Sequence, residues 1–179
     1  MGAGSLLLAF VMVQRFAELV LARRNTQRPR AVGAVEYGRV HYGAIVALHA
    51  VWLAGLWGLG YDRPVDRVFL VGFAVLQATR IRVIASLGRR WTTRIMVLAG
   101  ETLIRRGPYR LIRHPNYLIV TLEIAVVPLA LDLPLYGAVF FMLNVLALRV
   151  RIRTEDAALA WATDAVRPDP IDAPDRTPG

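Results

Sequence analysis

The chain of 179 residues is 56% hydrophobic, which is too apolar for an ordinary soluble domain or a disordered chain. Its 22 basic residues, all arginine, outnumber 13 acidic residues and give a net charge of +9. The arginines fall in bands between apolar runs and form no aromatic–basic platform for bases, which indicates a membrane protein and no nucleic-acid partner. The absence of cysteine excludes a disulfide framework and a cysteine nucleophile.

Apolar runs of the length that crosses a bilayer, about 20 residues, recur along the chain. They occupy residues 4–22, 42–60, 68–87 and 117–148. Pro128, Asp132 and Pro134 divide the last run and indicate the corner of a helical hairpin. The sequence therefore predicts an all-α, polytopic integral membrane protein with about five transmembrane helices, the fourth and fifth of which form the hairpin.

Arginines gather in three segments, which follow the first, third and fifth predicted helices. These segments are residues 23–39, 80–113 and 149–153. The loops at the opposite ends of the helices are short and carry little net positive charge. The positive-inside rule then predicts a cell-membrane protein with its N-terminus outside and its C-terminus in the cytoplasm. The proline- and aspartate-rich residues 167–179 are expected to form a disordered tail after a single domain of residues 1–166.

Several polar residues lie inside the predicted helices, where they are costly. Arg15 and Glu18 are three residues apart, so they share a helix face, and we interpret them as a structural ion pair. His49 has no nearby companion for a metal site and is expected to be a hydrogen-bonded packing residue. Glu123 has no basic residue within one turn, so its partner is another helix or a ligand, or the carboxyl is protonated; structural and functional roles both remain open.

Two polar stripes continue along the helix that follows the last apolar run. One stripe holds Asn144, Arg151 and Glu155, and the adjacent one holds Arg149, Arg153 and Asp156. The spacing is compatible with a solvated face of paired charges and with the wall of a polar pocket at the mouth of the bundle.

The loop of about 30 residues before the fourth helix is longer than most connections in a compact bundle, and such loops are often functional. It ends in the stretch Gly107-Pro108-Tyr109-Arg110-Leu111-Ile112-Arg113-His114-Pro115-Asn116-Tyr117. This stretch and the segment 149–159 resemble the isoprenylcysteine carboxyl methyltransferase (ICMT) family and its phospholipid methyltransferase relatives. That family combines a G-P-Y-R-x-x-R-H-P-x-Y stretch with an arginine-rich segment and an acidic pair after a helical hairpin. The resemblance covers residues 80–160.

The N-terminal third carries a set of polar and glycine residues, namely Gln14-Arg15, Glu18, Arg23-Arg24-Asn25, Gly33-Ala34, Glu36 and His41-Tyr42. In these residues it resembles one bacterial branch of the family. That branch is associated with O-methylation of long-chain alkylpyrone or alkylresorcinol lipids. The chain departs from the family pattern at Ile119, where glycine is usual, and at Asp156, where a second glutamate is usual.

The resemblance implies S-adenosylmethionine as cofactor, bound in a cytoplasmic pocket, and a lipophilic acceptor that enters from the bilayer. The implied cofactor-binding residues are Leu103, Gly107, Arg113, His114, Tyr117 and Glu155. We expect Arg149 or Arg153 to orient the acceptor oxygen, and Glu123, a histidine or Asp156 to act as a general base for a weakly acidic phenol. The acceptor is expected to be a polyketide-type lipid or an isoprenoid or carboxylate-like group, and the arginine bands are expected to contact membrane lipids.

Two alternatives remain at this point. The same motif occurs in phospholipid amine N-methyltransferases, and the chain offers no feature that separates them from O-methyltransferases. A non-catalytic lipid-binding membrane protein with a retained fold is the other alternative. Binding of S-adenosylmethionine would argue against the second, because a ligand of the native state raises its apparent stability.

Overall fold

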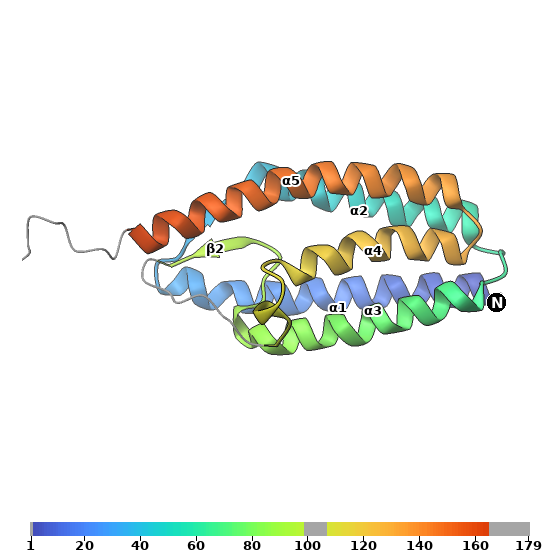
Figure 1. Cartoon of the computed structure of the whole chain (residues 1–179), viewed down its shortest axis with the longest axis horizontal. Coiled ribbons are helices and arrows are strands. Elements are labelled where there is room, and N and C mark those ends of the chain that lie inside the picture. Colours follow the sequence, from blue (N-terminus) through green and yellow to red (C-terminus); the bar gives the residue numbers. More distant parts are fainter. Residues whose placement is uncertain (1, 99–106, 165–179) are drawn as a thin grey trace, which may run out of the picture.

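Five α-helices lie side by side in an elongated bundle in the computed structural model, which describes residues 2–98 and 107–164 (Figure 1). The helices are α1 (Ala3–Ala31), α2 (Arg39–Gly60), α3 (Arg67–Leu87), α4 (Pro115–Ala130) and α5 (Pro134–Asp164). The prediction of a helical, multi-pass membrane protein is confirmed, because four of the helices, all except α4, are long and apolar enough to cross a membrane. The 16 residues of α4 extend only about 24 Å, against about 30 Å of bilayer hydrocarbon.

One end of the bundle, which we call the corner end, contains the connections from α2 to α3 and from α4 to α5. The sequence predicted that Pro128 interrupts the helix, but α4 continues through this residue. The corner itself contains Asp132, with a φ of 54°, and Pro134 begins α5. The backbone N–H of Asp66 donates to the carbonyl oxygen of Ala130 at 2.8 Å and ties the two connections together. The predicted hairpin is thus present, with a tighter corner than expected.

The opposite end, which we call the β end, contains two short strands that the all-α prediction did not include. Strands β1 (Val35–Tyr37) and β2 (Ile95–Val97) pair in antiparallel register. Ile95 and Val97 are buried against Ala158 and Ala162 of α5. The strands and the C-terminal part of α5 lie together beyond the apolar part of the bundle (Figure 1).

Helix α1 extends beyond the predicted end at Ala22, through the first arginine band to Ala31. The side chain of Asn25 donates to the backbone oxygens of Trp91 at 2.8 Å and Gly88 at 3.3 Å. This contact fixes the extension of α1 to the segment between α3 and β2. The first arginine band is therefore partly a helix surface rather than a loop.

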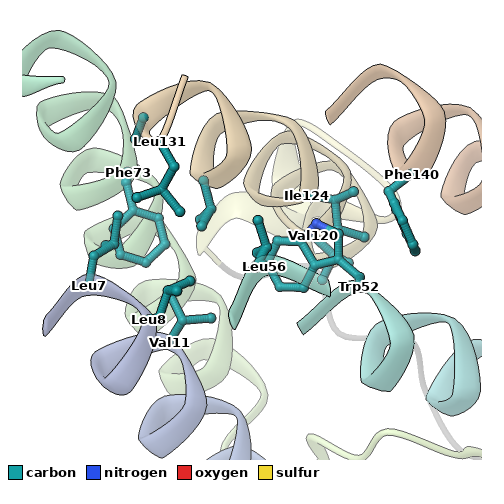
Figure 2. Packing of buried hydrophobic residues seen from close by; sticks show 12 residues of the cluster. Leu7, Leu8, Val11, Trp52, Leu56, Phe73, Val120, Ile124, Leu131 and Phe140 are labelled. Carbon is teal, nitrogen blue, oxygen red and sulfur yellow. The ribbon is translucent and has the colours of Figure 1, made fainter. Parts of the chain in front are cut away.

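The apolar core lies between the helices in the half of the bundle nearer the corner end (Figure 2). Its fully buried side chains include Leu8, Trp52, Leu56, Ile124 and Leu131. Half of the residues of the short helix α4 are buried, and it packs against both α3 and α5. Because lipid is as apolar as these side chains, close packing rather than exclusion from water holds the helices together.

Candidate functional site

A cavity of about 1170 Å³ lies inside the bundle and extends to the β end. Apolar side chains of α1 and α2, among them Phe16, Val46 and Leu53, form one wall. Polar side chains from α4, α5 and the segment before α4, among them His114 and Glu155, form the other end. A single space that joins an apolar wall to convergent polar groups is typical of a ligand pocket, here for an amphiphilic molecule.

The polar end of the cavity is a network of hydrogen bonds between α4, α5 and the segment just before β2. The hydroxyl of Tyr117 donates to the carboxylate of Glu155 and accepts from Nε of Arg151 at 2.9 Å. Arg151 also donates to the backbone oxygen of Thr93 at 2.7 Å. The imidazole of His114 stacks on the Tyr117 ring at 5.4 Å, with Nδ1 3.9 Å from the Glu155 carboxylate. The motif before α4 and the segment after the hairpin therefore meet, as the resemblance implied.

Three of the residues implied as cofactor ligands belong to the segment before α4, and their positions differ. Arg113 lines the cavity, with 63% of its side chain exposed. Gly107 lies outside the lining. Its φ of 53° favours glycine, and an added Cβ would be 2.5 Å from Oγ of Ser86 on α3, so that side chain would have to move. Leu103 is outside the described residues. Tyr109 lines the cavity, where burial and the charge of Glu155 raise its pKa to about 12.

The two polar stripes of α5 have different surroundings. The residues of α5 that line the cavity recur every three or four positions, as expected for one face of a helix. They are Leu148, Arg151, Glu155, Leu159 and Ala162. Arg149 and Arg153, expected to orient the acceptor, lie on the exposed face instead. Arg151 and Glu155 of the first stripe form part of the pocket wall, whereas the second stripe is largely solvated. Arg151 therefore lines the cavity, where Arg149 or Arg153 was expected.

Asp156, one of the two acidic residues expected as a general base, also lies outside the cavity lining. Its carboxylate accepts from Nε2 of His114 at 3.2 Å and pairs with Arg113 at 3.0 Å. These contacts orient the His114 ring toward Tyr117 and Glu155. The position of Asp156 therefore corresponds to a group that positions His114.

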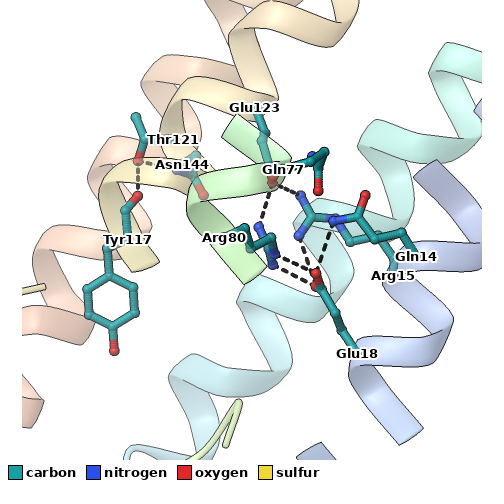
Figure 3. A network of polar contacts seen from close by, with 9 residues as sticks. All are labelled: Gln14, Arg15, Glu18, Gln77, Arg80, Tyr117, Thr121, Glu123 and Asn144. Atoms are coloured by element: carbon teal, nitrogen blue, oxygen red, sulfur yellow. Dashed lines mark hydrogen bonds and ion pairs between the residues drawn. The ribbon is translucent and has the colours of Figure 1, made fainter. Parts of the chain in front are cut away.

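Glu123, the other acidic residue expected as a base, lies in a buried ionic cluster that joins α1, α3 and α4 (Figure 3). Its carboxylate is 1% exposed and accepts from Arg15 at 2.7 Å, from Arg80 at 2.5 Å and from Gln77 at 2.7 Å. Glu18 pairs with both arginines, which confirms the predicted Arg15–Glu18 pair. The partner that Glu123 needed thus comes from other helices, and its carboxylate faces cations instead of the cavity.

A second cluster of charged contacts, centred on Glu36 of β1, borders the cavity through Arg94, which lines it. Glu36 pairs with Arg30 at 2.6 Å, with Arg39 at 3.4 Å and with Arg94, and its side chain is 3% exposed. Burial alone would raise the pKa of Glu36, but the hydrogen bonds from Arg30 and Arg94 and the charges of Arg94 and Arg39 outweigh it and lower the pKa. Arg94 also lies over the ring of Tyr42, which lines the cavity.

Several residues in the cavity wall were not expected from the sequence. The indole N–H groups of Trp52 and Trp91 and Oδ1 of Asn116 are buried and have no hydrogen-bond partner among the described residues. His49 lines the same space. The i, i+4 relation of Arg151 to Glu155 could have identified Arg151, and Asn116 lies inside the motif, but no sequence signal distinguishes Trp91 from a core tryptophan.

Together the fold and the cavity define a multi-pass membrane protein whose polar pocket opens from an apolar bundle. Sequence comparison defines it further: the pattern of the Isoprenylcysteine carboxyl methyltransferase (ICMT) family matches residues 68–161. The chain is 36% identical to the uncharacterized protein YpbQ of Bacillus subtilis (strain 168), over 86% of this chain and 95% of that protein. It is 25% identical to an uncharacterized protein of Haemophilus influenzae, over 85% of this chain and 92% of that protein. No solved structure matches the chain.

The chain belongs to the ICMT family, and family membership implies a membrane methyltransferase. Enzymes of this family use S-adenosylmethionine, which carries a carboxylate, an ammonium group, ribose hydroxyls and an adenine. The polar end of the cavity suits such a ligand, because it combines the guanidinium of Arg151 and the carboxylate of Glu155 with the unpartnered donor of Trp91 and acceptor of Asn116.

Proposed function

We propose that the protein is an S-adenosylmethionine-dependent O-methyltransferase of a lipophilic acceptor, with a polyketide-type lipid such as an alkylpyrone or alkylresorcinol as the favoured class. The observation that carries the proposal is the continuity of the cavity, which joins the network of His114, Tyr117, Glu155 and Arg151 to the apolar walls of α1 and α2. Residues 1–166 act as one catalytic domain in this proposal.

The cofactor binds at the β end. Arg113, His114 and Arg151 are donors for its carboxylate, and Glu155 accepts from its ammonium or ribose groups. Gly107 supports this end through its packing on α3 and not as a direct ligand. Methyl transfer from a sulfonium is an in-line displacement, so these residues contribute by alignment and by excluding water.

The acceptor occupies the part of the cavity between α1 and α2, where its chain contacts apolar side chains such as Phe16 and Leu53. Arg151 replaces Arg149 and Arg153 as the residue that faces the reacting groups, because it alone of the three lines the cavity. The β end faces the cytoplasm in this account, since the arginine-bearing C-terminal part of α1 and the strand segments that follow α1 and α3 lie toward that end of the bundle (Figure 1). That side also holds the cofactor supply.

Calorimetric titration of the detergent-solubilised protein with S-adenosylmethionine tests the proposal. Replacing Glu155 with glutamine or His114 with alanine removes one charge-assisted contact, worth about 1.5–3 kcal/mol, and is expected to weaken binding about ten- to a hundredfold. Asp132→Asn, at the corner end and 88% exposed, is the matched control and is expected to bind as the wild type does. Equal affinity of all four proteins would contradict the proposed site, and no binding by the wild type would favour a non-catalytic lipid-binding protein.

A further inference from the structure

The cavity contains one imidazole that the proposed cofactor site does not use. His49 of α2 lines the cavity together with Arg15, Glu18 and Arg80 of the ionic cluster, well away in sequence from the network around Tyr117. Neither acidic residue considered above as a general base lines the cavity. Glu123 accepts from three donors and Asp156 is bound to Arg113 and His114. Glu18 also lines this part of the wall, but its carboxylate pairs with Arg15 and Arg80. We therefore consider His49 the candidate for proton transfer there.

The hydrogen bond of His49 fixes which ring nitrogen is available. Its Nδ1 lies 2.8 Å from the backbone oxygen of Ile45. Because a carbonyl oxygen only accepts, Nδ1 carries the hydrogen, and Nε2 of the neutral ring carries a lone pair. No residue in the described part of the chain forms a hydrogen bond with Nε2. The backbone of α2 thus holds the ring in the tautomer that a base requires.

The charged groups around His49 favour the neutral form of its ring. Arg15 and Glu18 of α1 and Arg80 of α3 are the charged groups that act on His49. With Glu123 of α4 they form two cations and two carboxylates, paired with one another. The two arginines are like charges for a protonated imidazole and outnumber the one carboxylate that acts on the ring. They therefore favour the neutral imidazole that a base requires.

We propose that His49 is the general base that removes the proton from the acceptor hydroxyl; this rests on the proposed function. The hydroxyl proton moves to Nε2 of His49, and the oxygen electron pair that is freed forms the new O–C bond. The bound cofactor supplies the methyl group, and the electrons of the broken C–S bond stay on sulfur. Charge is conserved, because the positive charge of the sulfonium is replaced by that of the imidazolium, which then returns its proton to water.

Two acceptors of different acidity test this assignment in the variant His49→Asn, whose amide can still donate to the oxygen of Ile45. With an alkylphenol the variant is expected to lose about 10²–10⁴-fold in rate, the usual contribution of a general base. With an alkyl nitrophenol of the same chain length, which is already ionised at the assay pH, its rate is expected to stay within a few-fold of the wild type. His41→Asn, on the same helix but outside the cavity lining, is the control and is expected to match the wild type with both acceptors.

The pH profile gives a second readout. With the alkylphenol, the wild-type rate is expected to rise as His49 loses its proton and then to level off, whereas the rate of His49→Asn rises only where the phenol itself ionises. An equal loss of rate with both acceptors, or no loss with either, would overturn the role of His49. Absence of methyl transfer by the wild type to any acceptor would instead overturn the proposed function.

A measurement on the wild-type protein without cofactor gives a readout that does not depend on the activity of His49→Asn. Nitrogen-15 NMR of histidine-labelled protein is expected to show His49 with its hydrogen on Nδ1, assigned by comparison with His49→Asn. Addition of the alkylphenol is expected to shift the Nε2 resonance of His49 and to leave that of His41 unchanged. A hydrogen on Nε2 of the free protein, or no response to the phenol, would contradict the proposal.

Discussion

Neutralising Glu123 is expected to destabilise the protein more than almost any other single change of charge. The carboxylate is 1% exposed and lies between Arg15 and Arg80, of which Arg80 is 4% exposed. In Glu123→Gln the shape is kept, but two guanidinium groups then share the single carboxylate of Glu18. Removing one partner of a buried ion pair leaves an uncompensated buried charge, at a cost of about 3–5 kcal/mol.

For a chain of this size, 1 kcal/mol corresponds to about 2–4 °C in Tm, so the expected decrease is about 6–20 °C. Thermal unfolding of the purified protein in detergent measures it. Asp132→Asn is the matched control, because its ion pair with Arg63 spans 3.5 Å at an exposed position and contributes at most about 1 kcal/mol.

The double variant Glu123→Gln/Arg80→Gln sharpens the test. It removes one charge of each sign and restores the balance between Arg15 and Glu18. Residues of one ionic network are coupled, so the double variant is expected to be less destabilised than the sum of the two single variants. Strict additivity, or a decrease in Tm for Glu123→Gln no larger than that of Asp132→Asn, would refute the argument.

Two further predictions concern the β end. The pKa of Glu36 in the folded protein lies below its ordinary value of 4.5, so its contribution to stability is present above pH 4.5 and is lost as the pH falls through the folded pKa. The Tm of the wild type is expected to decrease over this acidic range, and the Tm of Glu36→Gln is expected to change less with pH. Parallel curves of Tm against pH for the two proteins would contradict this prediction. Gly107→Ala is expected to lower the stability by about 1–3 kcal/mol, because the new Cβ approaches Ser86 at a positive φ. Unchanged thermal unfolding of Gly107→Ala would show that the loop adjusts freely.

Much of the membrane architecture was predictable because it follows from one-dimensional patterns. The apolar runs and the arginine bands predicted the helices and the common end of the basic segments. The hairpin corner followed from the backbone limits of Pro134 and the residues before it. The same patterns said nothing of the strand pair at residues 35–37 and 95–97, since each strand has only three residues and pairs with a segment about 60 positions away.

The positions of site residues were predictable where they belong to a sequence motif of fixed spacing. The meeting of His114 and Tyr117 with Glu155 followed from the resemblance, and the helical period explains why Arg151 rather than Arg149 faces the cavity. The partners of Glu123 could not be predicted, because they lie 43 and 108 residues away on other helices. His49 was expected to be a packing residue, since the sequence does not show which face of α2 borders a cavity.

Transfer of a labelled methyl group from S-adenosylmethionine to a long-chain alkylphenol by the purified protein tests the central claim most directly. The account predicts label in the lipid product as an aryl methyl ether, at a rate that falls strongly in Glu155→Gln and stays unchanged in Asp132→Asn. Label found only on a phospholipid amine would contradict O-methylation. Absence of label in any lipid, with cofactor bound, would contradict catalysis of methyl transfer altogether.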